Sequence, residues 1–130
     1  MLQEFVNKNN LPVTIHGSTD DISGILEQHD IFISCSIIEG FGISVAEAMA
    51  AQIPMLISDI TTFKEITENK GWFFESRNAS DLANKIELFY NTPAITNQSV
   101  ADCRNVAEKY RKYLYVEKLN ELYQSKLKED

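Results

Sequence analysis

A chain of 130 residues has the length of one domain, and 44% hydrophobic with 24% charged residues is the balance of an ordinary globular protein. Its net charge of −7 argues against binding to nucleic acid or to anionic lipid, because both favour a basic surface. We therefore treat residues 1–130 as a single domain and expect no nucleic-acid partner.

Apolar spacing predicts helices that alternate with short strands along most of the chain. The C-terminal part, residues 99–130, departs from this alternation and is predicted to be helical. In chain order we expect a helix at 2–9, a strand at 13–16, a helix capped by Ser18, a strand at 31–35, a helix at 43–51, a strand at 55–58, a helix opening at a Thr62–Glu65 capping box, a strand at 71–74, a helix from Ser80 to Tyr90, a loop at 91–97, and helices at 99–111 and 116–128.

The alternation predicts an α/β fold with a Rossmann-like parallel sheet flanked by helices and joined by right-handed crossovers. Ligands of such sheets bind outside the carboxyl ends of the strands. Gly17, residues 39–42 and residues 58–62 all follow predicted strands at that end. We expect them to converge on one cleft.

The two cysteines, Cys35 and Cys103, do not have the spacing of a metal site, and we predict neither a metal nor a cofactor. Cys35 lies in an apolar run and is expected to be a small core residue. The N-terminus does not resemble a signal peptide, and no apolar run approaches membrane-spanning length. These features predict a cytoplasmic protein without an integral membrane segment.

The sequence Glu39-Gly40-Phe41-Gly42 opens the helix predicted at 43–51. A helix N-terminus offers free backbone N–H groups and a partial positive charge, which favour an anion such as a diphosphate. The two glycines let the backbone approach a ligand closely. Glutamates stand before the turn, at Glu39, and inside the helix, at Glu47. Because a carboxylate accepts hydrogen bonds from vicinal hydroxyls, this spacing suits a sugar-diphosphate-nucleoside.

Each residue of this motif can be given a role. Glu39 is the candidate catalytic residue and would accept hydroxyls of the transferred sugar. The backbone amides of Phe41, Gly42 and Ile43 would face the phosphates, and Glu47 would hold the ribose. The alternative is that both glutamates are simply exposed near a helix start, where the helix dipole favours acidic residues.

The segment from Glu39 to Ala50 resembles the E-x7-E segment of retaining GT-B glycosyltransferases, especially glycosyltransferase family 4, the glycosyl transferases group 1. The resemblance covers about residues 5 to 90. Its other parts are residues 13–17, 30–34, 54–58, 65–66 and Gly71.

The resemblance implies the donor-binding C-terminal domain of a GT-B enzyme, incomplete at its N-terminal side. It implies metal-independent transfer with retention from a nucleotide-diphosphate sugar of the UDP or GDP type, in a setting such as polysaccharide biosynthesis. It implies the roles given above for Glu39, Gly40, Phe41, Gly42, Ile43 and Glu47. The basic residues that neutralise the diphosphate in this family, and the acceptor-binding N-terminal domain, have no counterpart in the chain. We therefore expect the isolated chain to be inactive, and an open sheet edge makes a homodimer plausible.

Several residues keep two interpretations. His16 stands at a strand end beside Gly17, and it either contacts the nucleobase or fills space. Glu65 is either part of a capping box or a donor contact, and Trp72 either packs in the core or stacks on a sugar. At the level of function, the alternative is a non-catalytic nucleotide-sugar-binding or interaction subunit of a split glycosyltransferase. A third possibility is a receiver-like or flavodoxin-like domain with a chance motif.

Overall fold

The computed structural model describes residues 1–126, and the side chains described are those of residues 1–92, 97–111 and 116–125. Three parallel strands form the sheet in the order β1 (Phe32–Ser34), β2 (Met55–Ser58) and β3 (Trp72–Phe74). The predicted α/β fold with a parallel sheet is confirmed. Because the strands are parallel, all three carboxyl ends lie at one edge of the sheet.

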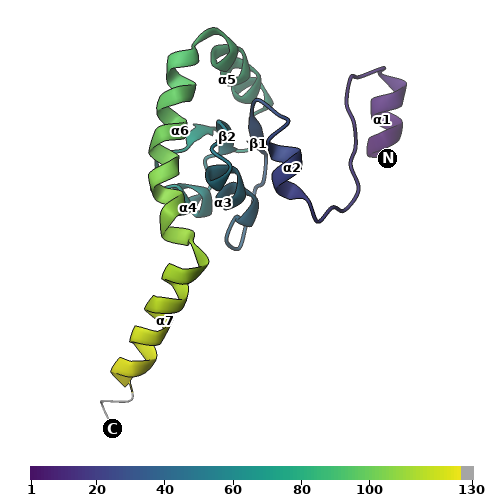
Figure 1. Cartoon of the computed structure of the whole chain (residues 1–130). Helices are drawn as coiled ribbons and strands as arrows, with labels where there is room; N and C mark the ends of the chain where they lie inside the picture. The colour runs from purple at the N-terminus through teal and green to yellow at the C-terminus, as the bar shows by residue number, and fades with distance from the viewer. Residues whose placement is uncertain (127–130) are drawn as a thin grey trace.

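Helices flank this sheet and extend beyond it at both ends of the chain. Figure 1 shows α6 running along one side of the sheet, α7 continuing away from it, and α1 standing apart on an extended segment. The predicted helix at 116–128 overlaps α7, and its last two residues lie outside the described part. The helices are α1 (Leu2–Lys8), α2 (Ile22–Leu26), α3 (Ile43–Ala50), α4 (Thr61–Ile66), α5 (Ala79–Asn91), α6 (Pro93–Ala107), the short 3₁₀ helix η1 (Glu108–Tyr110) and α7 (Lys112–Lys126).

The main core lies on one face of the sheet, under α3, α4 and α6. Met55 and Ile57 point from β2 into this core, and Phe63 of α4 is fully buried among them. Phe32 and Phe73 lie beside these β2 residues in the neighbouring strands and pack against the same cluster. All four residues of β2 are buried, as expected for a central parallel strand covered on both faces.

The opposite face of the sheet is covered by α5. Trp72 of β3 packs against Phe89 of α5, with ring centroids 5.7 Å apart. Leu56, which pairs with Trp72 in register, is fully buried on the same face. Of the two interpretations of Trp72, the structure supports packing: the half-buried ring lies against α5.

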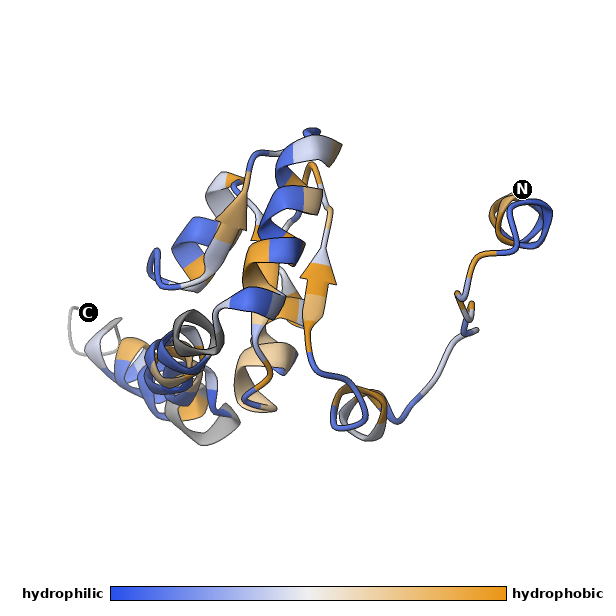
Figure 2. Ribbon diagram, turned by 90° about the horizontal axis from the view of Figure 1, so that it is seen from above, coloured by the Kyte–Doolittle hydropathy of each residue, from blue (hydrophilic) through white to orange (hydrophobic). Residues whose placement is uncertain are grey.

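The strand predicted at residues 13–16 is not formed. Residues 11–19 are instead an extended arm between α1 and α2, and Figure 2 shows the arm and α1 set apart from the sheet. A strand requires a neighbour to pair with its backbone N–H and C=O groups. No described strand lies beside the arm, so its alternating sequence stays unpaired.

Three predicted helix starts are wrong. Asp21, and not Ser18, caps α2, because its Oδ1 accepts the Gly24 amide hydrogen at 2.9 Å. Asn78, and not Ser80, caps α5 in the same way, through the Asp81 amide. Asn and Asp are at least as good as Ser at this position, so local preference could not separate these neighbours.

The Thr62–Glu65 capping box is the third wrong helix start. Helix α4 already begins at Thr61, with Ile60 as its N-cap and no side-chain cap. Thr62 therefore lies inside the first turn, where its hydroxyl is free to bond elsewhere. Glu65 is exposed and does not act in a capping box.

The loop predicted at 91–97 is also wrong, because α5 runs to Asn91 and α6 begins at Pro93. Only Thr92 separates the two helices, with φ −138° and ψ 74°. A residue before proline is pushed out of the helical region, whereas proline itself suits the first helical position. The Thr92–Pro93 pair therefore joins the two helices without a loop.

The two cysteines differ in burial. Cys35 lies beyond the end of β1 and is exposed, so the prediction of a core residue is wrong. Cys103 of α6 is buried in the core, and burial raises the pKa of its thiol to about 11. Among residues 1–126, no helix is both long and apolar enough to cross a membrane.

Candidate functional site

The loop that joins β1 to α3 lies at the carboxyl edge of the sheet and carries Glu39. Ser36 donates a hydrogen bond from Oγ to Glu39 Oε1 at 2.8 Å. Thr62 of α4 donates from Oγ1 to the Glu39 carbonyl at 2.9 Å, and Ser58 at the end of β2 donates to the Ser36 carbonyl. Three hydroxyls from three segments thus hold the half-buried Glu39 in place.

Gly42 links this loop to α3 and needs to be glycine on two grounds. Its φ of +86° lies in the left-handed region, which L side chains rarely adopt. A Cβ atom at Gly42 would also stand 3.1 Å from Cε1 of the buried Phe63. At Gly40, by contrast, an added Cβ would meet nothing within 4 Å, so the backbone there is open to a ligand.

The N-terminus of α3 has no side-chain cap. The Val45 and Ala46 amides both donate to the Gly42 carbonyl, at 3.0 and 3.1 Å. Within the described part of the chain, the Ile43 and Ser44 amides have no hydrogen-bond acceptor. The Phe41 and Ile43 side chains are exposed on either side of this turn. The turn therefore presents free N–H groups at the positive end of a helix dipole.

Glu47 lies on the outward face of α3, between two cavities. One cavity, of about 500 Å³, lies between α3 and η1. The rings of Phe41 and Tyr110, which line it, make an edge-to-face contact with their centroids 5.8 Å apart. The other, of about 330 Å³, lies between α3, β1 and α2. In the described part of the chain, the half-buried Glu47 carboxylate has neither an ion pair nor a hydrogen bond. Both of its oxygens are therefore available to hydroxyl donors.

The structure brings together two of the three segments that were expected to converge. Hydrogen bonds join residues 36–39 directly to Ser58 and Thr62. The third segment, with His16 and Gly17, lies in the exposed arm. Within residues 1–126 it makes no hydrogen bond to the Glu39 loop, so the structure does not include it in the cleft.

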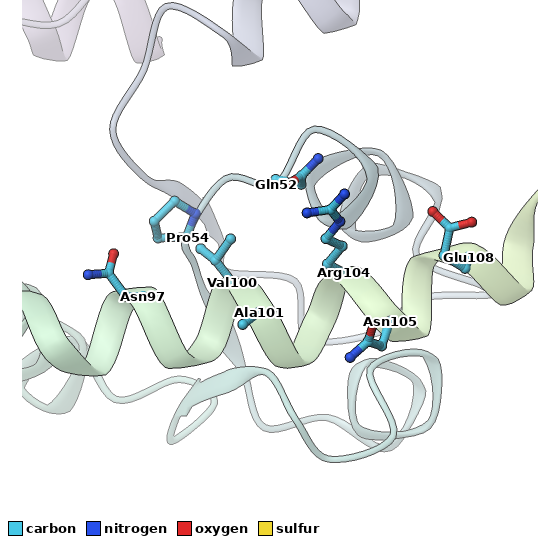
Figure 3. Close-up of a pocket in the computed structure, with 8 residues that line it drawn as sticks. All are labelled: Gln52, Pro54, Asn97, Val100, Ala101, Arg104, Asn105 and Glu108. Carbon is cyan, nitrogen blue, oxygen red and sulfur yellow. The ribbon is translucent and has the colours of Figure 1, made fainter.

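A larger cavity than these two lies elsewhere, at the amino end of β2. Figure 3 shows its wall, in which Gln52 and Pro54 face Val100 and Arg104 of α6. Its volume is about 780 Å³, and no residue of the Glu39 motif lines it. Ligands of parallel sheets bind at the carboxyl edge, so we do not assign the site to this cavity.

Sequence reasoning placed residues 58–62 at the ligand edge of the sheet but gave no role in the site to Ser58, Asp59 or Thr62, and it did not include Ser36. Each lies at, or just after, the carboxyl end of a strand. That position in a predicted parallel sheet was the available signal, because polar side chains there face the ligand edge. Their partners are up to 23 residues away in the sequence, so no local pattern indicated the bonds.

Asp59 connects the segments that follow β2 and β3. Its Oδ1 accepts the Ser76 amide hydrogen at 2.9 Å, and its Oδ2 lies 3.4 Å from Nζ of Lys64. The Ser76 hydrogen bond, with a contribution from Lys64, lowers the pKa of Asp59 below its ordinary value of 3.8. Because the carboxyl is partly exposed, solvent screens its attraction to Lys64, and the effect on stability is small.

We expect the Asp59 interaction to appear as a pH dependence of stability. A lowered pKa in the folded state adds stability above the ordinary pKa of 3.8, and this stability is lost as the pH falls through the folded value. The change Asp59→Asn should therefore shrink the drop in urea midpoint between pH 5 and pH 3. Asp20→Asn, at an exposed residue, should leave the drop unchanged. An equal drop in wild type and Asp59→Asn would contradict the assignment.

The fold is an α/β domain in which an uncapped helix N-terminus stands between two glutamates at the carboxyl edge of a parallel sheet. The family model described as glycosyl transferases group 1 matches residues 1–113. The chain belongs to this family.

Curated relatives are longer than this chain. It is 26% identical to a putative glycosyltransferase, EpsD, of Bacillus subtilis, over 85% of this chain and 30% of that protein. It is 29% identical to an N,N'-diacetylbacillosaminyl-diphospho-undecaprenol alpha-1,3-N-acetylgalactosaminyltransferase of Campylobacter jejuni, over 96% of this chain and 33% of that protein. The chain thus spans about a third of the length of these relatives.

Solved structures also match this chain over only part of their own length. A glycosyltransferase of Rickettsia africae matches 99% of this chain and 36% of its own, with a TM-score of 0.88 and 26% identity. The Anabaena protein Alr3699/HepE, solved in complex with UDP, matches 95% of this chain and 36% of its own, with a TM-score of 0.82 and 21% identity. The fold is therefore that of part of a GT-B glycosyltransferase.

Proposed function

We propose that the chain is the donor-binding part of a glycosyltransferase that takes a sugar from a nucleotide-diphosphate sugar of the UDP or GDP type. The observation that carries the proposal is the turn at Gly42, where uncapped amides of α3 stand between Glu39 and Glu47. Membership of the family supports this function. The Anabaena Alr3699/HepE structure, which was solved in complex with UDP, supports a nucleotide ligand for the shared fold.

In this proposal each part of the turn contacts one part of the donor. The Phe41, Gly42 and Ile43 amides, with the Ser44 amide beside them, bind the diphosphate, because they lie at the positive end of a helix. Glu47 accepts the ribose hydroxyls from the outward face of α3. Glu39, held by Ser36, accepts hydroxyls of the transferred sugar through the oxygen that Ser36 does not occupy.

The proposed transfer proceeds with retention and without a metal ion. Fixed N–H groups at the helix terminus stabilise the charge that develops on the leaving diphosphate, and they need no reorganisation during the reaction. Glu39 contacts the sugar that is transferred and is the proposed catalytic residue. The compartment is the cytoplasm, whose reducing conditions suit the free thiols Cys35 and Cys103.

Calorimetric titration with UDP, GDP and ADP tests the donor site. We expect one nucleotide to bind and Glu47→Ala to weaken its binding about 10- to 100-fold, the effect of losing hydrogen bonds to a charged acceptor. The matched control is Glu87→Ala, at an exposed glutamate of α5 on the other face of the sheet. Equal affinity of wild type and Glu47→Ala would contradict the ribose role.

A second titration separates the two glutamates. Glu39→Gln should weaken the binding of the nucleotide sugar while leaving the affinity for the free nucleotide unchanged. Glu47→Ala should weaken both ligands alike, because it acts on the part that they share. If Glu39→Gln also lost affinity for the free nucleotide, Glu39 would have to contact the nucleotide as well as the sugar.

A non-catalytic nucleotide-sugar-binding or interaction subunit of a split glycosyltransferase is the second candidate. Within residues 1–126 no strand pairs with the outer edge of β1, and an open edge of this kind can pair with another polypeptide, which favours this candidate. We expect the isolated chain to show little or no sugar transfer, and an acceptor-binding domain and a homodimer are proposed partners. Robust turnover by the chain alone would overturn both the expected inactivity and this second candidate.

A further inference from the structure

The segment Gly40-Phe41-Gly42 is held at its two ends. Thr62 donates to the Glu39 carbonyl before it, and the Gly42 carbonyl at its end accepts the amides that open α3. Within residues 1–126, neither peptide group of Phe41 makes a hydrogen bond. Because glycine leaves the backbone much conformational freedom, the middle of the segment depends for a fixed position on the Phe41 ring, its one side chain.

Tyr110 of η1 holds the Phe41 ring. The two rings meet edge to face, with their planes at 81°, which is a favourable arrangement for the charge distribution of aromatic rings. Phe41 is 52% exposed and lies outside the core cluster, so the core does not hold its ring. Among the described residues, Tyr110 is its one aromatic partner.

Tyr110 is fixed in turn by α4. Its hydroxyl donates to the Ile66 carbonyl at 3.1 Å, and Ile66 is a buried residue at the end of α4. The first turn of the same helix carries Thr62, which holds the Glu39 carbonyl. One short helix thus supports the turn at two points, directly at Glu39 and through Tyr110 at Phe41.

We propose that Tyr110 is a positioning residue of the donor site, which holds the Phe41 ring and thereby fixes the direction of the Phe41 and Ile43 amides. This inference rests on the diphosphate role proposed above for these amides. Without Tyr110, the turn would have to become ordered when the diphosphate binds. The entropy lost by fixing one more backbone residue corresponds to about 10-fold in affinity.

The order of the turn tests this role without any nucleotide. Tyr110→Ala and Phe41→Ala remove the two halves of the contact, and Phe41 lies outside the core, so its substitution leaves the core intact. In both variants we expect the NMR order parameters of the backbone amides at 40–43 to fall from about 0.85, the value of a rigid backbone, toward about 0.6. Tyr110→Phe keeps the ring and should retain the order of wild type.

Glu68→Gln is the matched control. Glu68 pairs with Lys109, the residue before Tyr110, and this ion pair fastens η1 to the segment after α4. The substitution weakens the attachment of η1 and leaves both rings of the contact in place, so the order of the turn should not change. An equal loss of order in Glu68→Gln and Tyr110→Ala would overturn the proposal, because Tyr110 would then act only by attaching η1.

Titration with UDP, GDP and ADP measures the effect on the donor site. Tyr110→Ala should bind the preferred nucleotide about 10-fold more weakly than wild type does. The matching nucleoside, which lacks the diphosphate, should bind equally to both. Combining Tyr110→Ala with Phe41→Ala should weaken binding no further than either change alone, because both remove the same contact. Additive losses, or equal weakening of nucleoside and nucleotide, would contradict a role in directing the diphosphate amides.

Unchanged order of the turn in both alanine variants would overturn the proposal, whether or not a nucleotide binds. If wild type bound none of the three nucleotides, the proposed donor site would be contradicted instead. The order parameters would then still decide whether Tyr110 fixes the turn.

Discussion

Replacing Phe63 by alanine is expected to lower the free energy of unfolding by about 3–5 kcal/mol. Phe63 is fully buried between β2, α3 and α6, and its ring also supports the turn at Gly42. Domains of this size have about 5–15 kcal/mol of total stability, so the loss removes a large part of it. Urea unfolding followed by circular dichroism measures the change.

The matched control is the same substitution at an exposed phenylalanine. Phe5 of α1 is 58% exposed, and Phe5→Ala should change the free energy of unfolding by less than about 0.5 kcal/mol. If Phe63→Ala were no more destabilising than Phe5→Ala, the packing of α4 against the sheet would have to be different from that described.

Gly42→Ala is expected to cost about 2–4 kcal/mol of stability. The left-handed φ of +86° contributes about 1–2 kcal/mol for an L residue, and crowding of the new Cβ against Phe63 adds the remainder. Relief of this strain would also turn the Ile43 amide away from its present direction. We therefore expect Gly42→Ala to weaken nucleotide binding as well as stability.

Gly40→Ala is the internal control for Gly42→Ala. A Cβ at Gly40 meets nothing within 4 Å, so its effect on stability should be under about 1 kcal/mol. A background of Phe63→Leu separates the two parts of the Gly42 effect, because a smaller side chain removes the crowding but not the backbone strain. Contacting residues are expected to be non-additive. Additive losses would show that the Cβ contact does not contribute.

Periodicity and composition were sufficient for the body of the fold. The strands β1, β2 and β3 are short, largely apolar runs, and the helices between them follow helical spacing. The same local signals failed at helix ends, where Ser18 and Asp21 are equally good caps on chemical grounds. They failed again at Thr62, whose hydroxyl bonds to a carbonyl 23 residues away instead of to its own helix.

The candidate site was predictable in part. Glu39, Gly42 and Glu47 form a contiguous motif, so their relation to one helix start can be read from their spacing. Two of the three hydroxyls that hold the Glu39 loop come from β2 and α4, and only the folded sheet brings those segments to the same edge. The roles of Glu39 and Glu47 toward a donor stay predictions until the titrations are made.

The sequence by itself determined the family, the order of β1, β2 and β3 with the helices between them, and the glycine turn between two glutamates, because these depend on residues close together in the chain. Only the tertiary structure decided that Ser36, Ser58 and Thr62 support Glu39, and that residues 13–16 stand as an unpaired arm. Such features depend on long-range partners. A strand forms only where another strand meets its backbone, and a hydroxyl bonds to whichever carbonyl the fold brings to it.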